Sequence, residues 1–279
     1  MLDFAFWAPV FGGGLVAGAS GGLLSVYIVG MRIPFIGVCV AHAALAGAVF
    51  GSLAGLSGHM LMLPAMGGAM AMSLALGLAD PRRVRMDANI VMGLLFSITM
   101  GLAFLGFGLF GVLGKNDAEV RSLLWGSPFC SWGDVRLMAA VAVGLALFVI
   151  IFAKEMRAIL FSRTEAQAAG IRATGVWTGF LILTAAVLTV NFQTVGGLMI
   201  YSLISNPAAA AFQLVRGNRN AIALSMLFGA ASGFGGFAIS AMTDLPAGAV
   251  IVLVSSFIVM VAAIIGHFAH KFRRPATDR

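Results

Sequence analysis

The sequence has few charged side chains: only 10% of its 279 residues are Asp, Glu, Lys or Arg, whereas 61% are hydrophobic. A soluble domain carries about 25% charged residues, so these side chains are too few to cover a surface that faces water. The net charge of +7 comes from basic residues at the ends of apolar segments, as membrane topology predicts, and not from one patch for nucleic acid. The composition therefore indicates an all-α, polytopic integral membrane protein with lipid as its solvent.

Cysteine and the common catalytic motifs are also scarce. The two cysteines, Cys39 and Cys130, are far apart, so no structural disulfide is expected. There is no glycine-rich loop ending in Gly-Lys-Ser/Thr, no His-Glu-x-x-His in the membrane, and no pair of carboxylates within an apolar segment. We therefore expect this chain not to be an enzyme and to bind no cofactor of its own. ATP-driven work would need a separate ATPase.

Apolar segments of about 20 residues, the length that crosses a bilayer, recur from one end of the chain to the other. No basic residue precedes the first of them, so we expect it to stay as a span and not to be cleaved as a signal peptide. Nine spans are predicted, at 5–29, 38–56, 60–79, 88–112, 137–153, 176–193, 196–214, 221–241 and 247–269. Eight is the alternative count, because the connection before Gly196 is very short.

The basic residues test the count of nine. If the connections alternate, Lys115, Arg121 and Arg136 lie on one side of the membrane and the other fourteen of the seventeen Lys and Arg lie on the opposite side. Such a bias marks the cytoplasmic face. The sequence therefore predicts an N-terminus outside the cell and a C-terminus in the cytoplasm.

His42 is the clearest ionisable residue inside an apolar run, where polar groups usually face protein or a water-filled path. Cys39, three residues earlier, lies on the same face of a helix. A Cys-x-x-His pair could offer two ligands to zinc or another soft or borderline metal. The alternative is a neutral histidine that is hydrogen-bonded to a neighbouring helix beside a small buried thiol.

A second polar stretch interrupts the span at 196–214, where Ser202, Ser205 and Asn206 lie close to Pro207. Proline within a helix removes a backbone hydrogen bond and frees a carbonyl. Such interruptions line the substrate path in many transporters. A simple kink explains the same residues, so both interpretations stay open.

Several stretches, in this order and spacing, resemble the membrane permease subunit of bacterial ABC importers for zinc, manganese or iron. They cover nearly the whole chain: GVCVAHAALAG at 37–47, DANIVMGLLFS at 87–97, FSRTEAQAAGIRA at 161–173, TVGGLMIYSLISNPAAAAFQLVR at 194–216 and DLPAGAVIVL at 244–253. The resemblance implies a single permease domain over 1–279 with a type II importer fold. It also implies the bacterial inner membrane, a homodimer, two copies of a cytoplasmic ATPase, and an extracytoplasmic solute-binding protein.

The same resemblance assigns roles to residues. A cytoplasmic segment at about 155–175 would couple to the ATPase, with Arg163, Glu165, Ala166, Ala169 and Gly170 as its matched positions. His42 and Cys39 would touch a divalent metal, zinc first and then manganese or iron. Val38, Ser202, Ser205, Asn206 and Pro207 would line the path.

Position 38 departs from the family pattern, which has aspartate four residues before the histidine. With Val38 there, either Cys39 replaces the aspartate, or His42 offers a transient single ligand, or the cargo is a metal chelate or another small solute. A stand-alone secondary transporter or channel is the rival function, although no charged residue lies deep in a span to couple it to an ion gradient. A membrane scaffold without a path is a third.

Overall fold

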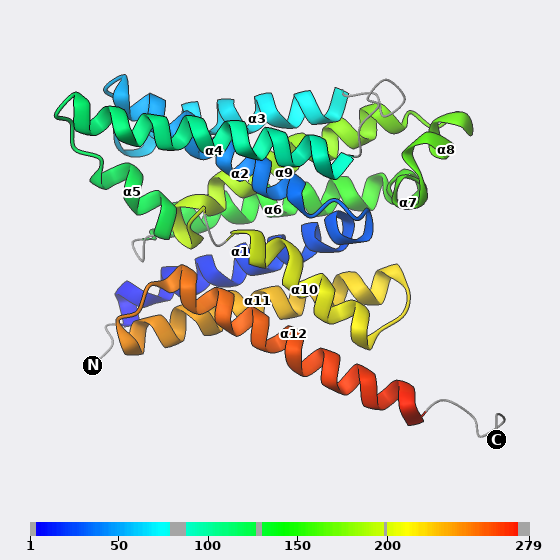
Figure 1. Cartoon of the computed structure of the whole chain (residues 1–279). Helices are drawn as coiled ribbons and strands as arrows, with labels where there is room; N and C mark the ends of the chain where they lie inside the picture. Colours follow the sequence, from blue (N-terminus) through cyan, green and yellow to red (C-terminus); the bar gives the residue numbers. More distant parts are fainter. Residues whose placement is uncertain (1–3, 79–87, 127–129, 198–199, 273–279) are drawn as a thin grey trace.

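The structure is a computed structural model that describes residues 4–78, 88–126, 130–197 and 200–272, and within these ranges it contains helices and no β-strand. The helices (Figure 1) are α1 (Phe4–Gly30), α2 (Phe35–Leu53), η1 (Gly58–Leu61), α3 (Met62–Leu78), α4 (Ala88–Val112), α5 (Ala118–Trp125), α6 (Trp132–Ile151), α7 (Ala153–Phe161), α8 (Arg163–Ala168), α9 (Ala173–Val195), α10 (Ile200–Leu214), α11 (Asn218–Thr243) and α12 (Ala247–Phe272). The predicted all-α class is confirmed.

Eight helices in the described ranges are long and apolar enough to cross a membrane. The segment predicted as the seventh of nine spans is α10, which has only 15 residues. A helix of that length rises about 22 Å, less than the roughly 30 Å of a hydrocarbon core. The very short connection expected before Gly196 is instead the last turn of α9, which continues to Val195. The structure thus agrees with eight full spans and explains the ninth as a short helix.

Although α10 is short, it runs from one end of the bundle to the other, so the chain changes direction as often as it would with nine spans. One end of the bundle contains the short helix α5, where the amide of Gly197 donates to the carbonyl of Leu123 just after α9 ends. The other end contains α7 and α8, where the end of α1 at Gly30 approaches Leu160. Helix α11 begins at this second end and runs antiparallel to α1, so α10 must return from the α5 end to the α8 end (Figure 1).

Helices α1 and α11 touch backbone to backbone along a stripe of small residues. Gly14, Gly18 and Gly22 of α1 face Gly233, Gly229 and Ser225 of α11, and a Cβ atom on any of the three α1 glycines would overlap the α11 backbone. In lipid, helices gain little from excluding water, so close approach through small residues supplies the dispersion contacts that hold them together. The glycine-rich runs of the sequence therefore serve helix packing in this pair.

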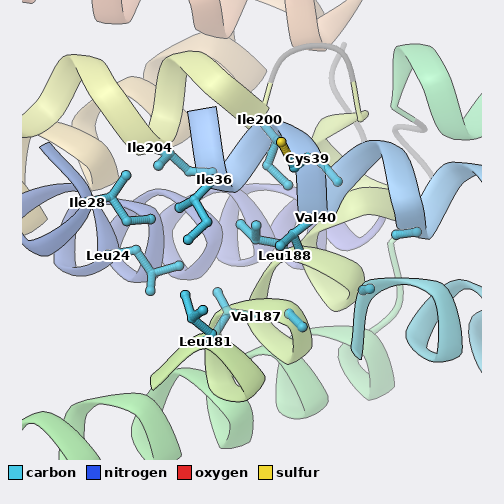
Figure 2. Packing of buried hydrophobic residues seen from close by; sticks show 14 of the residues in the cluster. Leu24, Ile28, Ile36, Cys39, Val40, Leu181, Val187, Leu188, Ile200 and Ile204 are labelled. Atoms are coloured by element: carbon cyan, nitrogen blue, oxygen red, sulfur yellow. The ribbon is translucent and has the colours of Figure 1, made fainter. Parts of the chain in front are cut away.

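The largest buried cluster is centred on α2 and α9 (Figure 2). Its members from α1, α2, α9 and α10 include Leu24, Ile28, Ile36, Cys39, Val40, Leu181, Val187, Leu188, Ile200 and Ile204. The outer helices α4, α6 and α12 instead turn many large apolar side chains outward, as lipid contact requires. Helix α2, which carries His42, is thus held in the interior of the bundle.

Candidate functional site

His42 lies on α2 and is 6% exposed. Its Nδ1 is 2.9 Å from the carbonyl oxygen of Val38, one turn earlier. Because a carbonyl can only accept, Nδ1 carries the hydrogen and donates it, which leaves the lone pair of the neutral ring on Nε2. No described residue forms a hydrogen bond with Nε2. Metal-binding histidines commonly donate their second ring N–H to a backbone carbonyl in this way; the metal role predicted for His42 stays a prediction.

The side chain of Cys39 is fully buried and points from α2 to α4. Its Sγ donates to the carbonyl oxygen of Met92 at 3.0 Å. To bind a metal, the thiol would have to leave this acceptor and lose its proton. The prediction that Cys39 contacts the cargo stays a prediction, and the hydrogen bond to Met92 gives the thiol a packing role between α2 and α4.

Helix α4 provides the wall that both side chains face, and the sequence reasoning did not assign that role to its residues. The ring of Phe96 meets the His42 ring edge to face, with centroids 5.0 Å apart. Met92 and Phe96 are one helical turn apart, which matches the spacing from Cys39 to His42 across the contact. The sequence did hold a signal for these residues, because Met92 and Phe96 lie in the stretch at 87–97, one of those that resemble the permease family.

The polar stretch of α10 does not interrupt the helix. The helix continues through Pro207, and the hydroxyl of Ser25 in α1 bridges the interruption. Ser25 Oγ accepts from the amide of Ala208 at 3.0 Å and lies 3.4 Å from the carbonyl oxygen of Ser205. A hydroxyl from the neighbouring helix thus supplies hydrogen bonds at the turn that contains the proline.

Asn206 binds a different neighbour. Its Nδ2 donates to the hydroxyls of Ser255 and Ser256 on α12, at 2.9 Å and 3.2 Å. The hydroxyl of Ser205 donates back to the carbonyl of Tyr201, and Ser202 is buried. The polar residues of α10 therefore join this helix to α1 and α12.

The predicted path residues do not gather around one point in this chain. His42 faces α4 and Asn206 faces α12, and these two helices lie on opposite sides of the bundle, with α2 and α10 between them (Figure 1). The contact between α2 and α10 is apolar, since a Cβ on Gly37 would lie 2.7 Å from Ile204 Cδ1. No group of three or more His, Cys, Asp or Glu side chains in the described ranges could hold a metal.

The predicted coupling segment folds as two short helices, α7 and α8, outside the long helices. Ser162 is the N-cap of α8, and its hydroxyl accepts from the amide of Glu165 at 3.2 Å. Gly170, with φ of +82°, ends it: its amide donates to Gln167 O, while the Ile171 amide donates to Ala166 O. This pair of bonds is a Schellman motif, which requires a left-handed residue where Gly170 stands.

The positions of this segment that match the permease family differ in their exposure. Ala166 is 4% exposed and packs inward, whereas Glu165, Ala169 and Gly170 are exposed. Phe161, the last residue of α7, is 93% exposed. The outer face of α8 and the end of α7 thus present an acidic side chain, small residues and one aromatic ring.

The inner face of α8 is bonded to the long helices. Arg163 Nη2 donates to the carbonyl of Gly77 in α3 at 2.9 Å and lies 3.5 Å from Thr174 Oγ1 in α9. Gln167 Nε2 donates to the same hydroxyl at 2.6 Å. Sequence reasoning placed Arg163 in the coupling segment but found neither Gly77 nor Thr174, because nothing in their spacing links three separate helices.

A bundle of eight membrane-length helices, with polar groups buried at helix contacts, defines a multi-pass membrane protein. The chain belongs to the ABC 3 transport family, whose sequence profile matches residues 2–266. The predicted resemblance to metal-type ABC permeases is therefore confirmed.

Curated relatives match this chain along most of their own length. The zinc transport system membrane protein TroC of Treponema pallidum is 28% identical over 91% of this chain and 87% of its own. The manganese transport system membrane protein MntC of Listeria monocytogenes is 24% identical over 94% of this chain and 91% of its own. A solved structure of PsaBC from Streptococcus pneumoniae has the same fold, with a TM-score of 0.77 at 21% identity over 93% of this chain and 91% of that one.

Proposed function

We propose that this protein is the permease subunit of an ATP-binding-cassette importer that carries a divalent transition metal into the cell. The observation that carries the proposal is His42, a membrane-buried imidazole whose Nδ1–H is held by Val38 O and whose Nε2 has no partner among the described residues. The family match supports the transport class. The names of the curated relatives support a metal as cargo and include both zinc and manganese.

The ligands around His42 favour zinc over manganese. Imidazole nitrogen suits zinc, whereas manganese prefers carboxylate and carbonyl oxygen. Position 38 is a valine, and within the described ranges His42 belongs to no group of three or more His, Cys, Asp and Glu side chains that could hold a metal. A single nitrogen ligand makes a transient contact with the cargo, as a conducting path requires.

Energy and delivery come from other subunits. We assign ATP hydrolysis to a cytoplasmic ATPase that docks on α7 and α8, and delivery of the metal to an extracytoplasmic binding protein. Two copies of the chain and two of the ATPase would form the complex in the bacterial inner membrane. We place the end with α7 and α8 in the cytoplasm because, among the described residues, it carries Arg32, Lys154, Arg157, Arg163, Arg172, Arg216 and Arg219, whereas Lys115, Arg121 and Arg136 belong to the α5 end.

Uptake by proteoliposomes tests the proposal. The permease, its ATPase and its binding protein are reconstituted together, and zinc and manganese uptake are measured with ATP inside the vesicles. His42→Ala should reduce uptake at least about tenfold, the effect expected when a metal contact is lost. His59→Ala, a histidine at the exposed helix η1, is the matched control and should leave uptake intact.

Two results would refute different parts of the proposal. Transport by the chain alone, with no ATPase or nucleotide, would establish a channel or secondary transporter. Uptake that is unchanged in His42→Ala would reduce His42 to a packing residue. If the wild-type complex carries neither free metal but takes up a metal chelate, the cargo assignment fails while the transport class stands.

A further inference from the structure

The guanidinium of Arg163 connects three helices that are distant in the sequence. Arg163 is the first residue of α8, and Nη2 donates to Gly77 O of α3 at 2.9 Å while also lying 3.5 Å from Thr174 Oγ1 of α9. Gln167, one turn later in α8, donates to the same Thr174 hydroxyl. Helix α8 is therefore attached to the bundle through two side chains that share one acceptor.

The bond from Arg163 to Gly77 has favourable chemistry. Gly77 lies in the last turn of α3, where carbonyls have no amide partner within the helix. A cation at a helix C-terminus also interacts favourably with the helix dipole. Arginine presents several donors in a rigid fork, so one side chain can serve Gly77 and Thr174 together, which the single ammonium of lysine cannot do as well.

The contact between α3 and α9 next to Arg163 contains two buried hydroxyls that lack a hydrogen-bond partner among the described residues. These are the hydroxyls of Ser73 in α3 and Thr178 in α9. A Cβ on Gly77 would lie 2.7 Å from Thr178 Oγ1, so the two helices are close at this level. Movement of α3 along α9 would break no hydrogen bond of these two hydroxyls, because they make none with the described residues.

Helix α3 in turn touches the helix that carries His42. A Cβ on Gly68 would lie 3.1 Å from the carbonyl carbon of Ala43, the residue after His42. A Cβ on Gly47 would likewise lie 3.2 Å from Ala65 Cα. The contacts of Gly68 and Gly47 are with backbone atoms, whereas Gly77 meets only the side chain of Thr178. A packed backbone contact transmits a displacement, so we expect α2 to follow α3 more closely than α9 does.

We propose that Arg163 is a positioning residue that transmits displacement of α8 to α3, and through the contact of Gly68 with Ala43 to His42. The inference rests on the proposed function, since the displacement of α8 is assigned to the docked ATPase. It adds a specific linkage: the side chain that holds α8 to α3 determines how much of the ATPase movement reaches the metal contact. Arg163 touches neither nucleotide nor cargo.

The number of metal ions transported per ATP hydrolysed measures this role, because a merely structural residue would lower both rates together. The reconstituted complex is assayed for uptake and hydrolysis with wild type, Arg163→Ala and Arg163→Lys. Arg163→Ala should lower the ratio about tenfold, within the range of known coupling between sites, and Arg163→Lys should fall between the two. Arg219→Ala removes an exposed arginine from the start of α11, at the same end of the bundle, and should leave the ratio unchanged.

A second variant keeps the test decisive if Arg163→Ala does not assemble. Thr174→Val preserves the shape of the side chain and removes the acceptor shared by Arg163 and Gln167, so it too should lower the ratio. An unchanged ratio in Arg163→Ala, or in both Arg163→Lys and Thr174→Val, would overturn the positioning role. A wild-type complex without ATP-dependent uptake would refute the proposed function itself, which is a separate outcome.

Discussion

The contact between α1 and α11 gives a prediction with a magnitude that can be worked from the structure. An alanine Cβ at Gly18 would lie 2.5 Å from the carbonyl carbon of Gly229 and 2.9 Å from the amide nitrogen of Ala230. Non-bonded carbon atoms rest about 3.5–4.0 Å apart. Gly18→Ala must therefore push the two helices apart by about 1 Å or strain them by a similar amount.

That separation has an energetic cost along the whole stripe. A gap of about 0.5–1 Å already loses a quarter to a half of each dispersion contact, and overpacking of an interior typically costs about 1–3 kcal/mol. Because Gly14 and Gly22 lose close contact as well, we expect the upper part of this range. At about 2–4 °C per kcal/mol, thermal unfolding in detergent should occur about 5–10 °C lower.

Gly108→Ala is the matched control. Gly108 lies in α4, and a Cβ there would meet no atom within 4 Å. Both substitutions gain the same helix propensity, about 0.5–1 kcal/mol, so the difference between the two melting temperatures isolates the effect of close approach. Equal melting temperatures would show that α1 and α11 are not in backbone contact and would refute the glycine-mediated packing of these two helices.

Two further substitutions and one pH titration probe the site and its surroundings. Cys39→Ser should preserve uptake and the preference between zinc and manganese, because a hydroxyl can donate to Met92 O as the thiol does; a changed preference would identify Cys39 as a ligand. Phe161→Ser should weaken binding of the ATPase about tenfold, since an exposed aromatic anchor is commonly worth more than about 1 kcal/mol at an interface. Titration of the detergent-solubilised chain with ATPase measures this, and unchanged affinity would assign Phe161 to lipid. Burial, together with the charge of Asp134, raises the pKa of Cys130 to about 11. In a Cys39→Ser background its alkylation rate should therefore rise about tenfold per pH unit from about pH 7 to 9, because only the thiolate reacts; a plateau near pH 8 would contradict that pKa.

Most of the fold could be predicted because lipid imposes simple requirements. A spanning helix must be long and apolar, so the long helices and the all-α class were readable from composition. Helix α10 shows where this reasoning is insufficient: its 15 residues are too few to cross alone, yet it reverses the direction of the chain. The count of basic residues detected that reversal, since it depends on alternation and not on helix length.

The candidate site was predictable only where its residues share one helix. The spacing from Cys39 to His42 placed both on one face, but it could not show that Cys39 donates to Met92 O and that Phe96 covers His42. The polar stretch at 202–207 was identified as a possible part of the path, which stays a prediction, but its spacing could not show that Asn206 is bonded to α12. Contacts between distant helices depend on packing, which periodicity within one segment does not record.

The bridge from Ser25 to α10 makes two distant positions depend on each other. The hydroxyl of Ser25 accepts a hydrogen bond from the amide of Ala208, the residue after Pro207. The proline is therefore the reason that α10 needs this hydroxyl. An alanine at 207 would remove the proline ring that crowds the preceding turn, so that the Ala208 amide could bond within the helix and the constraint at 25 would be relieved. An alanine at 25 beside the native proline would instead leave the Ala208 amide without the Ser25 acceptor. The two positions are thus epistatic. Loss of the Ser25 hydroxyl is tolerated after Pro207 has been replaced but not before, so evolution can replace the pair more easily in that order than in the reverse.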